Sequence, residues 1–147
     1  MVIDHIGIVV RSLEAGIQQW EKLFGYRKDS SIVTNTRQKV RVVFLRKAES
    51  LTVKLIEPSA EDSPVSAFCR KGGGLHHICF RCEDVTAQVA ALKENGARLL
   101  VAPEPGEAFD NRSIAFLWAE NNLNFEVIDT DEKVGMLPPS GSGSAQS

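Results

Sequence analysis

The sequence predicts an α+β fold built from two similar modules in one chain. Residues 4–10 (Asp-His-Ile-Gly-Ile-Val-Val) align with residues 76–82 (His-His-Ile-Cys-Phe-Arg-Cys) at an offset of 72 positions. The same offset aligns residues 53–57 with residues 125–129. One constant offset that joins separated blocks indicates an internal duplication. A length of 147 residues is enough for one ordinary domain with a core.

The first half reads as a strand, a helix and further strands. Residues 3–10 are short, apolar and β-branched, which is typical of a buried strand. Ser12 is a good N-cap for a helix that runs to residue 23, and Gly25 follows its end. Residues 40–45 and 51–57 then predict a hairpin.

The second half repeats this order. Asp84 caps a helix that ends at Gly96, and residues 114–118 and 123–128 predict a second hairpin around a turn with two asparagines. A linker over residues 59–74 contains a short helix at 64–70.

The domain boundaries follow from these elements. We expect one domain over residues 1–130, with module one at about 2–58 and module two at about 75–130. Residues 131–147 are interpreted as a disordered tail, a linker to a further segment or a remnant of protein expression.

Composition excludes several classes of partner. Lys plus Arg number 17 and Asp plus Glu number 19, so the net charge of −2 weakens the case for nucleic acid or an anionic membrane. No apolar run approaches the roughly 18 residues that cross a bilayer, and the start lacks the pattern of a secretory signal. Three cysteines are an odd count at low density, which indicates a reducing environment. These features predict a cytoplasmic protein with no nucleic-acid or membrane partner.

The duplication points to a candidate metal site. His5 and His77 occupy equivalent inward positions in the two halves, so they would meet if the halves pack face to face. Glu126, on the last strand, could join them, and two imidazoles with one carboxylate suit a divalent ion with open positions. A lone inward histidine is more often a packed core residue, but a polar residue at the same inward position of both halves needs a shared reason. His76 points the other way in a regular strand and is interpreted as a surface residue or one that supports the site from behind.

The repeat, the two strand openings and the inward Glu126 resemble the vicinal oxygen chelate superfamily over about residues 2–130. That group includes glyoxalase I, fosfomycin and bleomycin resistance proteins and extradiol dioxygenases. The resemblance implies two tandem βαβββ modules that form a half-open barrel around a metal. Within the group, the segments 56–58, 62–65, 73–78 and 111–117 are most similar to the methylmalonyl-CoA epimerases.

This resemblance implies an activity. It implies metal-assisted proton transfer at the carbon next to the carbonyl of an acyl thioester, carried by CoA or a carrier protein. His5, His77 and Glu126 would hold an ion such as Co, Zn, Mn, Ni or Fe, and Glu126 would act as ligand or base.

The sequence departs from the epimerases at Lys54 and Arg37. Lys54 is the repeat partner of Glu126 and stands where the epimerases have a glutamate or glutamine ligand. Protonated lysine cannot bind a cation, so three interpretations remain open. Lys54 swings out and leaves three ligands, or it pairs with Glu126 in the metal's place, or it is a desolvated catalytic base or nucleophile. Arg37 stands where the epimerases have a catalytic glutamate.

Other functions stay open at this point. The chain could be a non-catalytic binding or sequestering protein with a degenerate metal site, as in bleomycin resistance. It could also be a biosynthetic lyase or oxygenase, because two histidines and a carboxylate suit Fe(II). Open sheet edges favour a homodimer. A basic stretch is either a solvated strand face or a contact for CoA phosphates; it consists of Arg37, Lys39, Arg41 and Arg46.

Overall fold

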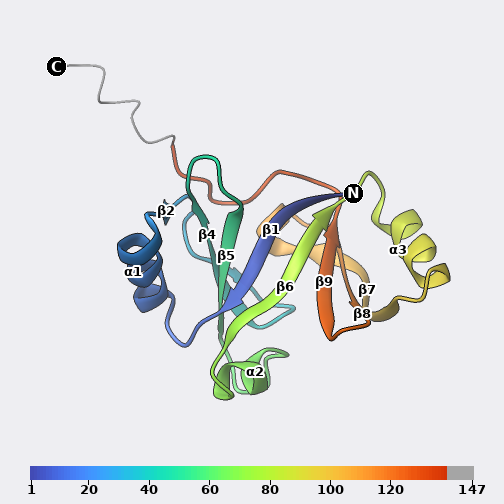
Figure 1. The fold of residues 1–147 in the computed structure, drawn as a ribbon, viewed down its shortest axis with the longest axis horizontal. Coiled ribbons are helices and arrows are strands. Elements are labelled where there is room, and N and C mark those ends of the chain that lie inside the picture. The colour runs from blue at the N-terminus through green and yellow to red at the C-terminus, as the bar shows by residue number, and fades with distance from the viewer. Residues whose placement is uncertain (139–147) are drawn as a thin grey trace.

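A computed structural model of the protein describes residues 1–138 and shows one mixed, nine-stranded sheet with helices on its flanks (Figure 1). The strands run in the order β2-β4-β5-β1-β6-β9-β8-β7, and β3 pairs with β4 outside this path. The sheet is not closed, and β2 and β7 are the ends of the path. The elements are β1 Val2–Val9, α1 Leu13–Phe24, β2 Arg27–Lys28, β3 Val33–Asn35, β4 Val40–Arg46, β5 Thr52–Pro58, α2 Ser66–Arg70, β6 Gly74–Arg81, α3 Val85–Glu94, β7 Arg98–Gly106, the 3-10 helix Glu107–Phe109, β8 Arg112–Ala119 and β9 Leu123–Ile128.

The two halves are arranged symmetrically in the sheet, which confirms the predicted fold class. β1 and β6 open the two modules and pair antiparallel at the centre. β1 pairs in parallel with β5, and β6 pairs in parallel with β9. Each of these outer partners closes a hairpin with the strand before it, β4 or β8. The β1–β6 ladder is therefore the seam between the modules.

Both predicted long helices form where their capping residues indicate. The Ser12 hydroxyl accepts a hydrogen bond from the Ala15 N–H, and Gly25 ends α1 with a φ of 72°. The Asp84 carboxylate accepts one from the Ala87 N–H at the start of α3. Each helix covers its own apolar cluster at its own end of the sheet (Figure 1). A third cluster lies between the modules and surrounds the site described below.

Strand β7 is absent from the elements that the sequence predicts. It carries Pro103 and Pro105, residues that lack an N–H and are confined to edge strands and irregular positions. Its pairing with β8 shifts register twice, which hides the usual alternation of apolar and polar residues. Strands β2 and β3 have only two and three residues, too few to show a periodic pattern.

The segment after residue 130 differs from the expected disordered tail. The Val134 N–H donates to the Ala108 carbonyl, and the Leu137 N–H donates to the Asp29 carbonyl. Residues 131–138 therefore lie against the body of the protein. The remainder of the expected tail, residues 139–147, lies outside the described residues.

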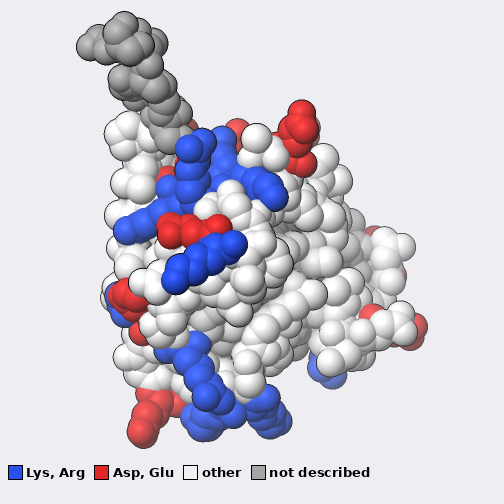
Figure 2. All heavy atoms as spheres, turned by 60° about the vertical axis from the view of Figure 1, so that its left-hand side comes forward, with Lys and Arg blue, Asp and Glu red and all other residues white. Residues whose placement is uncertain are grey.

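The face that carries α1 does not present a field of one charge. On the face that carries α1, Lys and Arg lie beside Asp and Glu (Figure 2). Arg41 contacts Glu14 and Glu57 at 3.2 and 3.0 Å, and Arg46 contacts Asp29 at 2.9 Å. These pairings favour a solvated strand face over a phosphate site. No helix among residues 1–138 is long and apolar enough to span a bilayer.

Candidate metal centre

His5, His77 and Glu126 converge from the three neighbouring strands β1, β6 and β9. His5 Nε2 lies 3.5 Å from Glu126 Oε1, and His77 Nε2 lies 3.8 Å from the same oxygen. Each residue offers a ligand atom within 4.8 Å of the others. All three residues are buried, the most exposed being His77 at 3%. The structure thus brings together the three side chains that the sequence selected as ligands.

The atoms that face one another lack partners of their own. His5 Nε2, His77 Nε2 and both carboxylate oxygens of Glu126 are buried without a hydrogen-bond partner among the described residues. An unsatisfied buried polar atom costs about 1–3 kcal/mol, so four atoms in one place need a shared explanation. Two imidazole nitrogens and a carboxylate form a donor set that Zn, Co, Mn, Ni and Fe all accept. The residues present therefore fit a divalent transition metal ion.

Each histidine is held by the residue that precedes it. The His5 Nδ1–H donates to Asp4 Oδ2 at 2.7 Å, and the Nδ1 atoms of His76 and His77 lie 2.8 Å apart. Asp4 and His76 are 72 positions apart, so they are equivalents in the duplication. A ring whose Nδ1 carries the proton keeps the lone pair of Nε2 for a metal ion. The contact with Asp4 fixes this form for His5, and His77 takes it when its Nδ1–H donates to His76 Nδ1.

His76 reaches the site because β6 is irregular at this point. Gly7 pairs with His77 but Ile8 pairs with Leu75, so the register shifts across His76. The shift breaks the alternation of faces, and both neighbouring histidines contact the site. The sequence alone indicates only a surface or supporting residue at this position. The equivalence of His76 to Asp4 is the signal that identifies its role.

The local electrostatics favour the ligating forms of the side chains. Burial lowers the pKa of His77 well below its ordinary value, although the charge of Glu126 opposes this. Burial raises the pKa of Glu126, but chiefly the Lys54 ammonium, together with the two neighbouring imidazoles, outweighs this and holds that pKa below its usual range. A neutral imidazole and an ionised carboxylate are the forms that bind a cation.

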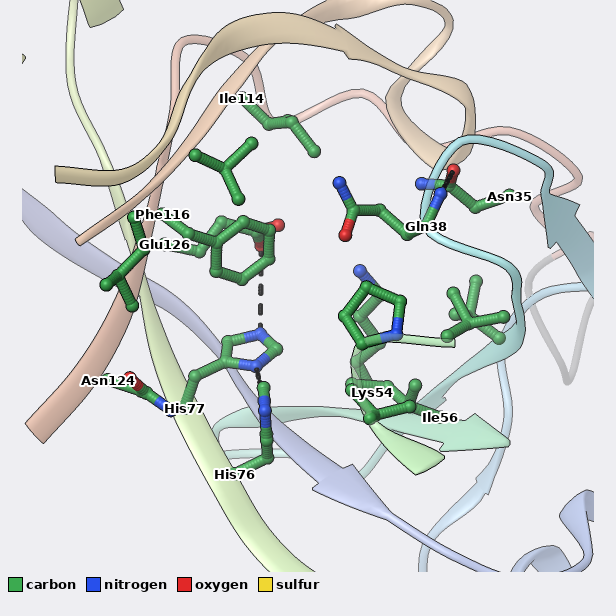
Figure 3. A pocket seen from close by; sticks show the side chains of 16 residues that line it. Asn35, Gln38, Lys54, Ile56, His76, His77, Ile114, Phe116, Asn124 and Glu126 are labelled. Atoms are coloured by element: carbon green, nitrogen blue, oxygen red, sulfur yellow. Dashed lines mark hydrogen bonds and ion pairs between the residues drawn. The ribbon is translucent and has the colours of Figure 1, made fainter. Parts of the chain in front are cut away.

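Beside the three residues lies a cavity of about 240 Å³ (Figure 3). His77 and Glu126 line it, whereas His5 does not. Much of its wall is apolar, and neutral amides add polarity without charge. These lining residues include Val40, Val42, Ile56, Ile114 and Phe116 on the apolar side and Asn35, Gln38 and Asn124 among the amides.

Lys54 projects into this cavity from β5 (Figure 3). It is 6% exposed, and its Nζ lies 5.1 Å from the ring centroid of Phe109 and 5.9 Å from that of Phe44. It forms no ion pair within 4.0 Å with Glu126 or any other carboxylate in residues 1–138. Lys54 therefore lies inside the cavity and makes no direct ion pair with Glu126.

Arg37 lies outside the site. It is exposed, and its backbone N–H donates to Glu107 Oε1 at 3.3 Å. It does not line the cavity, so the position of the expected second base contributes no acid or base there.

A second group of potential ligands is less suited to an ion. Asp4, His5 and Cys79 also place ligand atoms within 4.8 Å of one another. Asp4, however, already accepts from His5 and contacts Lys133 Nζ at 3.1 Å. Burial, with the charge of Glu126, raises the pKa of the Cys79 thiol, and a protonated thiol is a poor ligand.

The fold and this donor set agree with the family to which the chain belongs. Residues 4–116 match the Glyoxalase/Bleomycin resistance protein/Dioxygenase superfamily, and the chain is a member of it. Among curated proteins it is 32% identical to the ethylmalonyl-CoA/methylmalonyl-CoA epimerase of Cereibacter sphaeroides, over 78% of this chain and 86% of that protein. It is 37% identical to the uncharacterized protein YqjC of Bacillus subtilis, over 78% and 81%. A structure of a variant of Streptomyces coelicolor methylmalonyl-CoA epimerase in complex with 2-nitronate-propionyl-CoA is similar with a TM-score of 0.77 and 29% identity, covering 88% of this chain and 97% of that one.

Proposed function

We propose that the chain is a metal-dependent enzyme of the epimerase type, which moves the proton at the carbon next to the carbonyl of an acyl-CoA thioester. The observation that carries this proposal is the set of four buried, unpartnered donor atoms beside a cavity. The relatives named as methylmalonyl-CoA epimerases support the reaction type and the CoA thioester as substrate class.

In this proposal His5, His77 and Glu126 hold the ion. When bound, the ion would supply Lewis acidity to a substrate oxygen that gains negative charge as the proton leaves. Asp4 and His76 keep the two imidazole rings oriented. The apolar wall around Phe116 excludes water from the reacting carbon and strengthens electrostatic interactions there.

The proton itself needs a donor and acceptor in the cavity. Among the described residues, the ionisable side chains that line it are Lys54, His76, His77 and Glu126. With His77 and Glu126 assigned to the ion, Lys54 and His76 remain to contact the substrate. They come from different strands, β5 and β6.

Hydrogen exchange at the substrate carbon tests the proposal directly. Methylmalonyl-CoA in D₂O is followed by NMR with the protein as purified, after EDTA, and after Co²⁺ is returned. We expect exchange that EDTA abolishes and Co²⁺ restores. Exchange that persists undiminished in metal-free protein would contradict metal assistance.

Measurements of thioester binding, iron content and oxygen uptake, made beside the exchange experiment, separate the other functions. A sequestering protein would bind the thioester without exchange, and an oxygenase would consume oxygen with bound iron. The homodimer stays a prediction from the open sheet edges, and sedimentation equilibrium would test it.

A further inference from the structure

Lys54 is the feature of the site that the epimerase assignment leaves unexplained. Its side chain is buried, faces the cavity and has no carboxylate partner within 4.0 Å among residues 1–138. The rings of Phe109 and Phe44 lie 5.1 and 5.9 Å from its Nζ and hold the ammonium in place. A buried ammonium that is positioned but unpaired is an incomplete interaction.

The charge of the cavity indicates what would complete it. Apart from the two histidines, the charged side chains that line the cavity in the described part of the chain are Lys54 and Glu126, and their charges cancel. A divalent ion on Glu126 would leave an excess of two positive charges beside an apolar wall. The ammonium and the ion then repel each other, and a small anion that contacts both relieves the repulsion.

We propose that Lys54 is the receptor for a free carboxylate on the substrate, so that the metal ion and a small carboxylate ligand bind cooperatively. The inference rests on the proposed function for the ion, and it deepens that function by naming the residue that would bind the carboxylate of the substrate. In an acyl thioester with a carboxylate close to the carbonyl, one ligand reaches both the ammonium and the ion.

Binding measurements on the folded protein test this role without relying on catalysis. Isothermal titration gives the affinity for Co²⁺ with and without malonate, and the affinity of the metal-free protein for malonate. We expect malonate to raise the affinity of the wild-type protein for Co²⁺ by about 10-fold. Acetate, which has one carboxylate and cannot span the two positions, serves as the matched ligand and should have little effect.

Two variants separate charge from ligation. Lys54→Met removes the ammonium and adds no donor, and Lys54→Gln adds a neutral oxygen beside the ligands. Both should lose the effect of malonate, and Lys54→Gln should bind Co²⁺ alone about 10-fold more tightly than the wild type. Thermal unfolding of each variant checks that it is folded.

The outcomes also distinguish this inference from the proposed function. Malonate binding to the metal-free wild type that is lost in Lys54→Met supports the receptor, even if Co²⁺ does not bind and the metal proposal fails. The role of Lys54 as a carboxylate receptor is wrong if malonate binds equally to the wild type and Lys54→Met, or binds to no form of the wild type. Proton exchange in the thioester could still be observed in that case, and the proposed function would stand.

Discussion

Gly7 gives His77 the room that it occupies, so Gly7→Ala tests the geometry of the candidate metal centre. The two residues are paired across the β1–β6 ladder. A Cβ atom on residue 7 would overlap His77 Cε1 and lie 2.6 Å from both ring nitrogens. Because Cε1 would lie at 2.3 Å, the ring must retreat by about 1.1 Å to restore an ordinary contact of 3.4 Å. Metal–ligand distances tolerate only about 0.2 Å, so His77 would no longer reach a shared ion.

The expected result is a loss of metal affinity in a protein that still folds. We expect the affinity for Co²⁺, measured by isothermal titration, to fall about 100-fold. Urea unfolding of the metal-free variant should show a loss of about 1–3 kcal/mol from overpacking. The matched control is Gly16→Ala, where the added carbon meets the flexible side chains of Leu55 and Val10 at 3.2 Å and no ligand. A folded Gly7→Ala protein with wild-type Co²⁺ affinity would refute the assignment of His77 as a ligand.

Three further predictions concern the groups around the ligands. Asp4→Asn removes the charge that supports His5 and should weaken Co²⁺ binding about 10–100-fold by isothermal titration, and an unchanged affinity would contradict the orienting role. Lys133→Met removes the contact between Lys133 and Asp4 and should lower the free energy of unfolding, measured in urea, by about 1–3 kcal/mol. Lys133→Arg keeps the positive charge and should retain most of the wild-type stability. Equal losses of stability in the two variants would show that the ion pair is not the cause. The metal-free protein should lose stability as the pH falls below about 6.5, by up to about 1.4 kcal/mol per pH unit. The reason is that the pKa of buried His77 is lowered, so its imidazole stays neutral in the folded protein but takes up a proton in the unfolded chain. A free energy of unfolding that stays constant from pH 7 to 5.5 would contradict the lowered pKa of His77.

Much of the candidate site could be predicted because residues at equivalent positions of the two duplicated halves are expected to lie close together in the fold. The shared position of His5 and His77 and the pairing of Lys54 with Glu126 needed only an offset and the alternation of strands. The position of His76 could not be predicted, because a bulge in β6 depends on pairing with β1 rather than on local sequence.

The parts of the fold that were missed share a physical cause. Strand β7, with its prolines and two register shifts, carries no regular alternation. Residues 131–138 have the composition of a tail, and only tertiary hydrogen bonds and the contact between Lys133 and Asp4 hold them in place. Structure that depends on contacts between residues far apart in the sequence cannot be predicted from the local sequence pattern.

A metal ion at the proposed site would join the two modules across the central ladder of β1 and β6. Its two imidazole ligands would come from different modules, His5 from β1 and His77 from β6. A cation held by both histidines would cross-link the two modules, and neither module alone would supply the full set of ligands. Loss of the ion would then also weaken the packing of one module against the other.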